Sequence, residues 1–114
     1  MNTYEARMKA LWRDDPTEAS MSVDLRLDAQ TGSISAPWDL LGAFDLDGEC
    51  TRPFVLRRDG KIDFGLSGPH RWRTNLRSLR VGVGARFQVF WNETDAGDYE
   101  VVKVARLGFR DKGE

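Results

Sequence analysis

The run Met21-Ser22-Val23-Asp24-Leu25-Arg26-Leu27-Asp28 decides the fold class of this 114-residue chain. Apolar and polar side chains alternate strictly along it, which is the period of a β-strand with one buried face and one solvated face. Sheets with one solvated face are typically antiparallel. The run therefore predicts one strand of an antiparallel sheet.

A hairpin is predicted over residues 53–66, and the apolar pattern selects its register. A three-residue loop at residues 58–60 sets Leu56 opposite Ile62, so that the apolar side chains of both arms share one face. A two-residue loop mixes the faces, because a slip of one residue moves every side chain to the other side of the sheet. Gly60 is expected to supply the left-handed conformation that this loop needs.

Two more strands are predicted near the end of the sequence, at about residues 85–91 and 98–107. Val101, Val102 and Val104 place apolar groups on both faces of the second strand. Strands that are apolar on both faces lie between a core and a covering layer. We therefore expect this strand to be central and to be covered by a second layer.

A helix is predicted over about residues 3–13 and could supply that cover. Four apolar residues fall at i, i+4, i+7 and i+8, which is one face of a helix: Tyr4, Met8, Leu11 and Trp12. Asn2 can cap the helix, with Glu5 completing a capping box. Asp14-Asp15-Pro16 is a stop signal.

These elements together predict an α+β protein with one domain over residues 1–114. The N-terminal helix, about 3–13, is expected to pack on a strongly bent antiparallel β-sheet or small β-barrel of about six or seven strands, within about 21–107. Residues 108–114 are expected to form a short polar tail.

Composition favours a cytoplasmic protein. The single cysteine, Cys50, cannot form an internal disulfide. The start of the chain lacks the basic and then apolar pattern of a signal peptide. No apolar run approaches the ~20 residues that span a bilayer, so no membrane partner is expected.

No catalytic, metal or cofactor motif is found. His70 is the only histidine, which excludes a site with two histidine ligands from one chain, and there is no CxxC pair. The Gly82-x-Gly84 pair precedes a predicted strand and lacks the third glycine of a dinucleotide loop. The sequence therefore favours a protein without catalytic activity, cofactor or bound metal.

Charge is distributed unevenly along the chain. Residues 1–50 hold 4 basic and 10 acidic side chains, whereas residues 51–114 hold 13 basic and 8 acidic ones. The stretch from residue 52 to 86 has a net charge of +7. Opposite charges in the two halves favour a small binding or assembly module that self-associates as a homodimer.

The segment from residue 70 to 80 favours an alternative, a nucleic-acid-binding small barrel. It carries four arginines and no acid, and arginines grip phosphates while an exposed tryptophan stacks on a base. The candidate contacts are Arg71, Trp72, Arg73, Arg77 and Arg80. Three other readings stay open: Trp72 anchors the core, the arginines pair within the chain, or they meet a second copy.

A second alternative is a small-ligand-binding protein or enzyme with an aromatic-lined pocket. Aromatic faces attract cations, and carboxylates near a histidine can perform acid–base chemistry. The residues that could form such a pocket are Trp38, Asp45, Asp47, His70 and Trp72.

Overall fold

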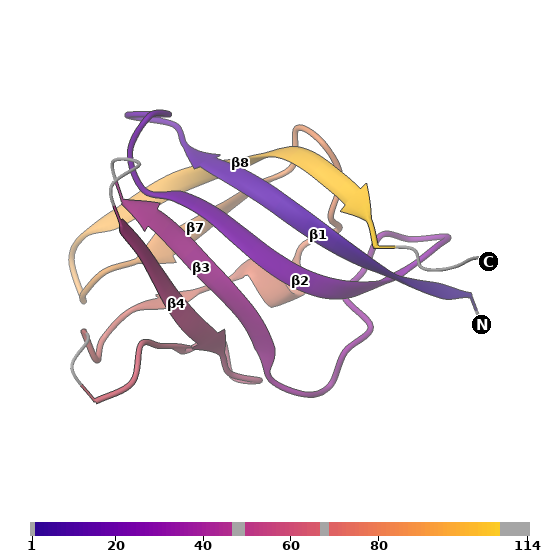
Figure 1. The fold of residues 1–114 in the computed structure, drawn as a ribbon, viewed down its shortest axis with the longest axis horizontal. Helices are drawn as coiled ribbons and strands as arrows, with labels where there is room; N and C mark the ends of the chain where they lie inside the picture. The colour runs from indigo at the N-terminus through magenta and orange to yellow at the C-terminus, as the bar shows by residue number, and fades with distance from the viewer. Residues whose placement is uncertain (1, 47–49, 67–68, 108–114) are drawn as a thin grey trace.

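The computed structural model describes residues 2–46, 50–66 and 69–107, which form an antiparallel sheet of eight strands. The spatial order is β5-β4-β3-β2-β1-β8-β7-β6, and the sheet curls so that β7 lies behind β2 and β3 (Figure 1). The strands are β1 (Thr3–Trp12), β2 (Ser20–Asp28), β3 (Leu40–Leu46), β4 (Cys50–Leu56), β5 (Ile62–Asp63), β6 (Arg73–Thr74), β7 (Arg86–Phe90) and β8 (Ala96–Arg106). A single 3-10 turn, η1 (Leu76–Ser78), lies between β6 and β7.

The two edges of the sheet meet and nearly close a barrel. The N–H of Ile62 donates to the carbonyl of Trp72 at 2.9 Å, and the N–H of Thr74 donates to the carbonyl of Gly60 at 2.8 Å. These bonds flank an isolated bridge between Lys61 and Arg73. We call this junction, residues 60–62 against 72–74, the seam.

The predicted N-terminal helix is wrong, and with it the α+β class. Residues 3–12 form β1, which pairs along its length with β2 on one side and β8 on the other. Tyr4, Met8 and Trp12 are spaced by four, which fits one face of a strand as well as one face of a helix. Ala6 and Ala10, both fully buried, complete the period of two. Alanine contributes a weak apolar signal, so the helical spacing dominated the prediction.

The covering layer predicted over the last strand is also wrong. Within the described residues nothing covers the outer face of β8, and the side chain of Val102 is 39% exposed. Lys9 pairs with Lys103 but Ala10 pairs with Val101, so β8 holds an extra residue at this point. Such a β-bulge turns Val101 and Val104 to the same side. The run of valines therefore reflects a bulge and not a second layer.

The predicted number of about six or seven strands is too low, because the described residues form eight, two of which are only two residues long. The predictions for β2 and for the hairpin are confirmed. β2 buries alternate residues from Met21 to Leu27. The hairpin pairs Leu56 with Ile62, and Gly60 has a φ of +93°. A Cβ atom at Gly60 would also lie 2.7 Å from the carbonyl oxygen of Thr74 across the seam. Glycine is therefore needed here both for the turn and for closing the barrel.

The strands run between two ends of the barrel. Trp12 pairs with Tyr99, which places the end of β1 beside the β7–β8 connection, residues 91–95. We call this the tryptophan end, because the ring of Trp91 contacts the rings of Trp12 and Trp72 there. The other end holds the β2–β3 connection, residues 29–39, and we call it the β2–β3 end. No described residue belongs to a helix long and apolar enough to cross a membrane.

Candidate functional site

The fold divides the arginine-rich segment between the two ends of the barrel. Arg71, Trp72 and Arg73 enter the seam, and Arg73 pairs with Phe90 at the end of β7. Arg80 instead bridges to Ser33, in the β2–β3 connection. The five residues predicted as one contact surface therefore do not share one surface.

Arg77 is used inside the fold. Its guanidinium donates to four backbone carbonyls: Arg57 at 2.8 Å, Ala36 at 2.9 Å, Trp38 at 2.5 Å and Leu56 at 3.2 Å. Burial lowers the pKa of Arg77, because it disfavours the charged form. The side chain links the β2–β3 connection to the end of β4. Because its donors already bond these carbonyls, they are not free to bind a ligand.

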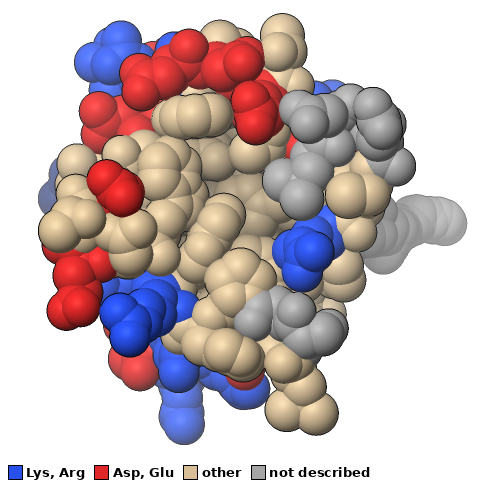
Figure 2. All heavy atoms as spheres, turned by 90° about the vertical axis from the view of Figure 1, so that its left-hand side faces the viewer, with Lys and Arg blue, Asp and Glu red and all other residues tan. Residues whose placement is uncertain are grey.

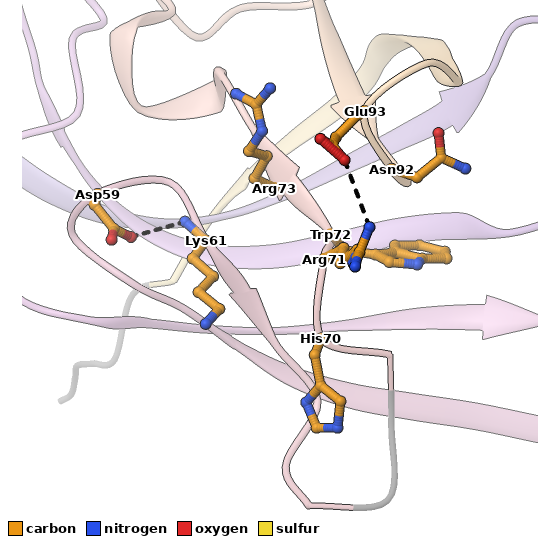
Figure 3. Close-up of a pocket in the computed structure, with 8 residues that line it drawn as sticks. All are labelled: Asp59, Lys61, His70, Arg71, Trp72, Arg73, Asn92 and Glu93. Atoms are coloured by element: carbon orange, nitrogen blue, oxygen red, sulfur yellow. Dashed lines mark hydrogen bonds and ion pairs between the residues drawn. The ribbon is translucent and has the colours of Figure 1, made fainter.

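A groove of about 530 Å³ lies beside the seam, next to the β7–β8 connection. Figure 3 shows the side chains that reach into it from both sides of the seam. Its lining residues are Asp59, Lys61, His70, Arg71, Trp72, Arg73, Asn92 and Glu93. Three of the predicted nucleic-acid contacts thus meet in one concave surface, together with His70.

The groove carries more positive than negative charge. Arg71 approaches Glu93 at 3.5 Å, but their side chains are 75% and 84% exposed, so water weakens the attraction. The carboxylate of Asp59 accepts the backbone N–H of Lys61 at 2.9 Å. Among the described residues neither Lys61 nor Arg73 takes part in an ion pair. Two cationic side chains are therefore available to an anionic ligand, and Arg71 is held only weakly.

Aromatic rings position two of the groove side chains. The guanidinium of Arg73 lies 4.8 Å from the ring centroid of Phe90, which favours one orientation of a long side chain. Trp72 is half-buried and meets the rings of Phe64 and Phe44 edge-on at 5.1 and 5.4 Å. Trp72 therefore anchors the core and lines the groove at the same time.

The residues predicted to form an aromatic-lined pocket are not brought together. Trp38 belongs to the β2–β3 connection, where the guanidinium of Arg26 covers its ring at 4.9 Å. Asp45 is exposed near the other end, opposite Ser20. Asp47 lies outside the described residues. Of the four predicted pocket residues that the structure describes, His70 and Trp72 line a common cavity, and Trp38 and Asp45 do not line it.

The sequence did not indicate the partners that complete the groove. Lys61 directly follows the hairpin loop, whereas Asn92 and Glu93 come from the β7–β8 connection. These segments are separated in sequence and come together only when the barrel closes at the seam, so no local sequence pattern indicates that they meet. Within the described ranges, no three His, Cys, Asp or Glu side chains are grouped closely enough to hold a metal ion.

The groove can bind an anion by charge and hydrogen bonding and can offer part of an indole ring for stacking. Comparisons with protein families, characterised proteins and solved structures find no match to this chain.

Proposed function

We propose that this chain is a non-catalytic binding module that holds a single-stranded nucleic acid in the groove beside the seam. The observation that carries the proposal is the meeting of Lys61, Arg71 and Arg73 around Trp72 in one open cavity. Lysine and arginine neutralise backbone phosphates, and an aromatic ring stacks on bases of any sequence.

A single strand suits this groove better than a duplex. Bases can stack on a protein ring only when they are unstacked from each other, as in loops and single strands. The chain as a whole has a net charge of −1, so acidic side chains balance its basic ones. The proposed site is therefore short and local, with three cationic side chains.

The salt dependence of binding tests whether three cationic side chains contact phosphates. Three neutralised phosphates on a single strand predict a slope of log K against log salt of about −2. Fluorescence anisotropy of labelled DNA and RNA oligonucleotides, single- and double-stranded, measures it. Absence of binding at low salt would contradict the proposal, as would tighter binding of the duplex.

Variants of the groove give the matched comparison. Arg73→Ala and Lys61→Ala are each expected to weaken binding and to reduce the slope by about 0.7, because each removes one phosphate contact. Arg80→Ala is the control, since Arg80 lies at the β2–β3 end. Equal losses in all three variants would assign the binding to overall charge and not to the groove.

A second candidate function is self-association as a homodimer, and the pattern of ion pairs favours it. Of the seven ion pairs among the described residues, only Arg13–Glu100 and Arg57–Asp39 join the acidic first half to the basic second half. Within residues 2–46, 50–66 and 69–107, most of the charge by which the two halves differ is therefore not paired between them. Sedimentation equilibrium at low and high salt tests this: a dimer that dissociates as salt rises supports it, and a monomer at every salt concentration contradicts it.

A further inference from the structure

The tryptophan end carries a second concave surface, which shares Trp72 with the groove beside the seam. Figure 2 looks onto this end and shows a hollow with uncharged walls at its centre. Trp12, Trp72, Trp91 and Phe64 belong to this end, and each residue is half-buried.

The rings are held in fixed mutual orientations. Trp12 and Trp91 meet edge-to-face at 5.4 Å, with an angle of 88° between their planes, and Trp91 lies 6.1 Å from Trp72. Gly97 makes this packing feasible, because a Cβ atom there would lie 2.8 Å from the Trp91 ring and 2.9 Å from Nε1 of Trp12. The faces are therefore positioned before any ligand arrives.

These three tryptophans differ from the other aromatic side chains near the surface. Trp38, Phe90 and Tyr4 each have an arginine guanidinium within 4.9 Å of the ring centroid. Phe64 has Arg52 at 5.9 Å. Among the described residues, no arginine or lysine covers Trp12, Trp72 or Trp91. This chain thus supplies cations to its other exposed rings and leaves the best cation-binding rings without one.

The rim of the hollow adds negative charge. The connection between β1 and β2, residues 13–19, carries Asp14, Asp15 and Glu18, and Asp45 of β3 lies beside it. Figure 2 shows acidic side chains in an arc along one edge of the hollow, with basic side chains on the opposite side. None of these four carboxylates takes part in an ion pair among the described residues.

We propose that the tryptophan end binds an alkylated ammonium group, with Trp12 and Trp91 supplying ring faces and the acidic arc supplying long-range attraction. An alkylated ammonium combines a full positive charge with an apolar surface, which is what an aromatic wall and a carboxylate rim complement together. Trp72 is shared with the groove, whereas Trp12 and Trp91 do not line it. The two sites can therefore be separated by mutation.

Two probes distinguish the source of the ammonium group. Choline represents a free small cation, and a peptide containing trimethyl-lysine represents a modified side chain. The neutral isostere 3,3-dimethylbutan-1-ol keeps the shape and removes the charge. Binding is followed through the indole N–H resonances of the protein's four tryptophans.

The expected result is a saturable shift of the Trp12, Trp72 and Trp91 resonances with at least one cation and no shift of Trp38, which lies at the β2–β3 end. The neutral isostere is expected to bind at least about fivefold more weakly, the factor for one cation–π contact. The probe that binds tighter identifies the source. The proposal is overturned if neither cation shifts these resonances at millimolar concentration, or if the isostere binds as tightly.

Conservative variants complete the test without leaving a large cavity in the core. Trp12→Phe and Trp91→Phe keep an aromatic ring but weaken cation binding, because tryptophan is the strongest partner. Asp14→Asn with Glu18→Gln should weaken it further and reduce its salt dependence. Trp38→Phe is the control and should leave the affinity unchanged. Loss of choline binding in Trp38→Phe to the same extent as in Trp91→Phe would refute the site.

Discussion

The β2–β3 end of the barrel and the groove beside the seam use the same residue types in opposite ways. At the β2–β3 end, Arg77 is bonded to four carbonyls and Arg57 holds both Asp39 and Asp63 at 2.8 and 2.6 Å. In the groove beside the seam, Lys61 and Arg73 have no ion-pair partner among the described residues. The β2–β3 end uses its cations to hold the fold together, whereas the groove keeps them available to a ligand. Arginine content alone does not distinguish these roles.

Replacing Arg77 tests the comparison most strongly. Arg77→Ala is expected to cost about 3 kcal/mol of unfolding free energy, because four carbonyls lose a charged donor. Urea unfolding measures the loss. Arg80→Ala, in the same segment but exposed, should change stability by no more than about 0.5 kcal/mol. Similar losses in the two variants would remove the structural role assigned to Arg77.

Filling the space under the two tryptophans is the next largest change. Gly97→Ala places a methyl group 2.8 Å from the Trp91 ring, and such overpacking is expected to cost about 2 kcal/mol. Thermal unfolding measures it, and near-ultraviolet circular dichroism reports the displaced indoles. Gly82→Ala is the matched control, since a Cβ atom there meets nothing within 4 Å. If Gly97→Ala leaves both signals unchanged, the rings are not fixed as described.

Tyr99, in the interior below the tryptophan end, is expected to make the stability of the protein depend on pH in alkaline solution. Tyr99 is fully buried and donates to the carbonyl of Ala19 at 2.9 Å, and burial raises the pKa of Tyr99 above its ordinary value. Because the folded state holds this proton more tightly than the unfolded chain, the stabilisation is complete below the ordinary tyrosine pKa of about 10 and is lost as pH rises through the folded value.

The expected loss is about 1.4 kcal/mol per pH unit above pH 10. Urea unfolding at a series of alkaline pH values measures it, and Tyr99→Phe should remove this part of the pH dependence. An unchanged slope in Tyr99→Phe would show that other groups cause it.

The smallest effect is expected at the exposed ion pair of the groove. Arg71→Ala should change stability by less than about 0.5 kcal/mol, because both Arg71 and Glu93 are largely solvated. Glu93→Gln should leave stability equally unchanged but increase oligonucleotide affinity, since it frees Arg71. A clear loss of stability in either variant would place this pair with the structural arginines of the β2–β3 end.

Local patterns predicted the parts of the fold that depend on neighbours in sequence. The alternation from Met21 to Leu27 fixed β2, and the burial rule fixed the pairing of Leu56 with Ile62. Both depend on short-range periodicity and turn chemistry, which a single sequence displays. β1 was missed because Ala6 and Ala10 carry too little apolar signal to outweigh a helical spacing.

The candidate site was predictable only in part. Arg71, Trp72 and Arg73 stand together in the sequence, so their shared location followed from proximity alone. Arg77 and Arg80 are separated from them because Arg77 bonds backbone carbonyls and Arg80 bridges to Ser33. These contacts form only in the folded chain. Lys61 joins them only through the seam, a long-range contact that no sequence pattern marks.

The position of β1 in the sheet also constrains how the chain can fold. β1 pairs with β8, so Ala6 must find Arg106, and that contact closes a loop containing most of the sequence. Closing so long a loop costs chain entropy before any side chain is buried, and sheets dominated by distant pairings fold in milliseconds to seconds. During synthesis, β1 through β4 can pair as hairpins, but one edge of β1 stays open until residues 96–106 have left the ribosome. We therefore expect nascent fragments that lack β8 to expose the β1 edge and to aggregate.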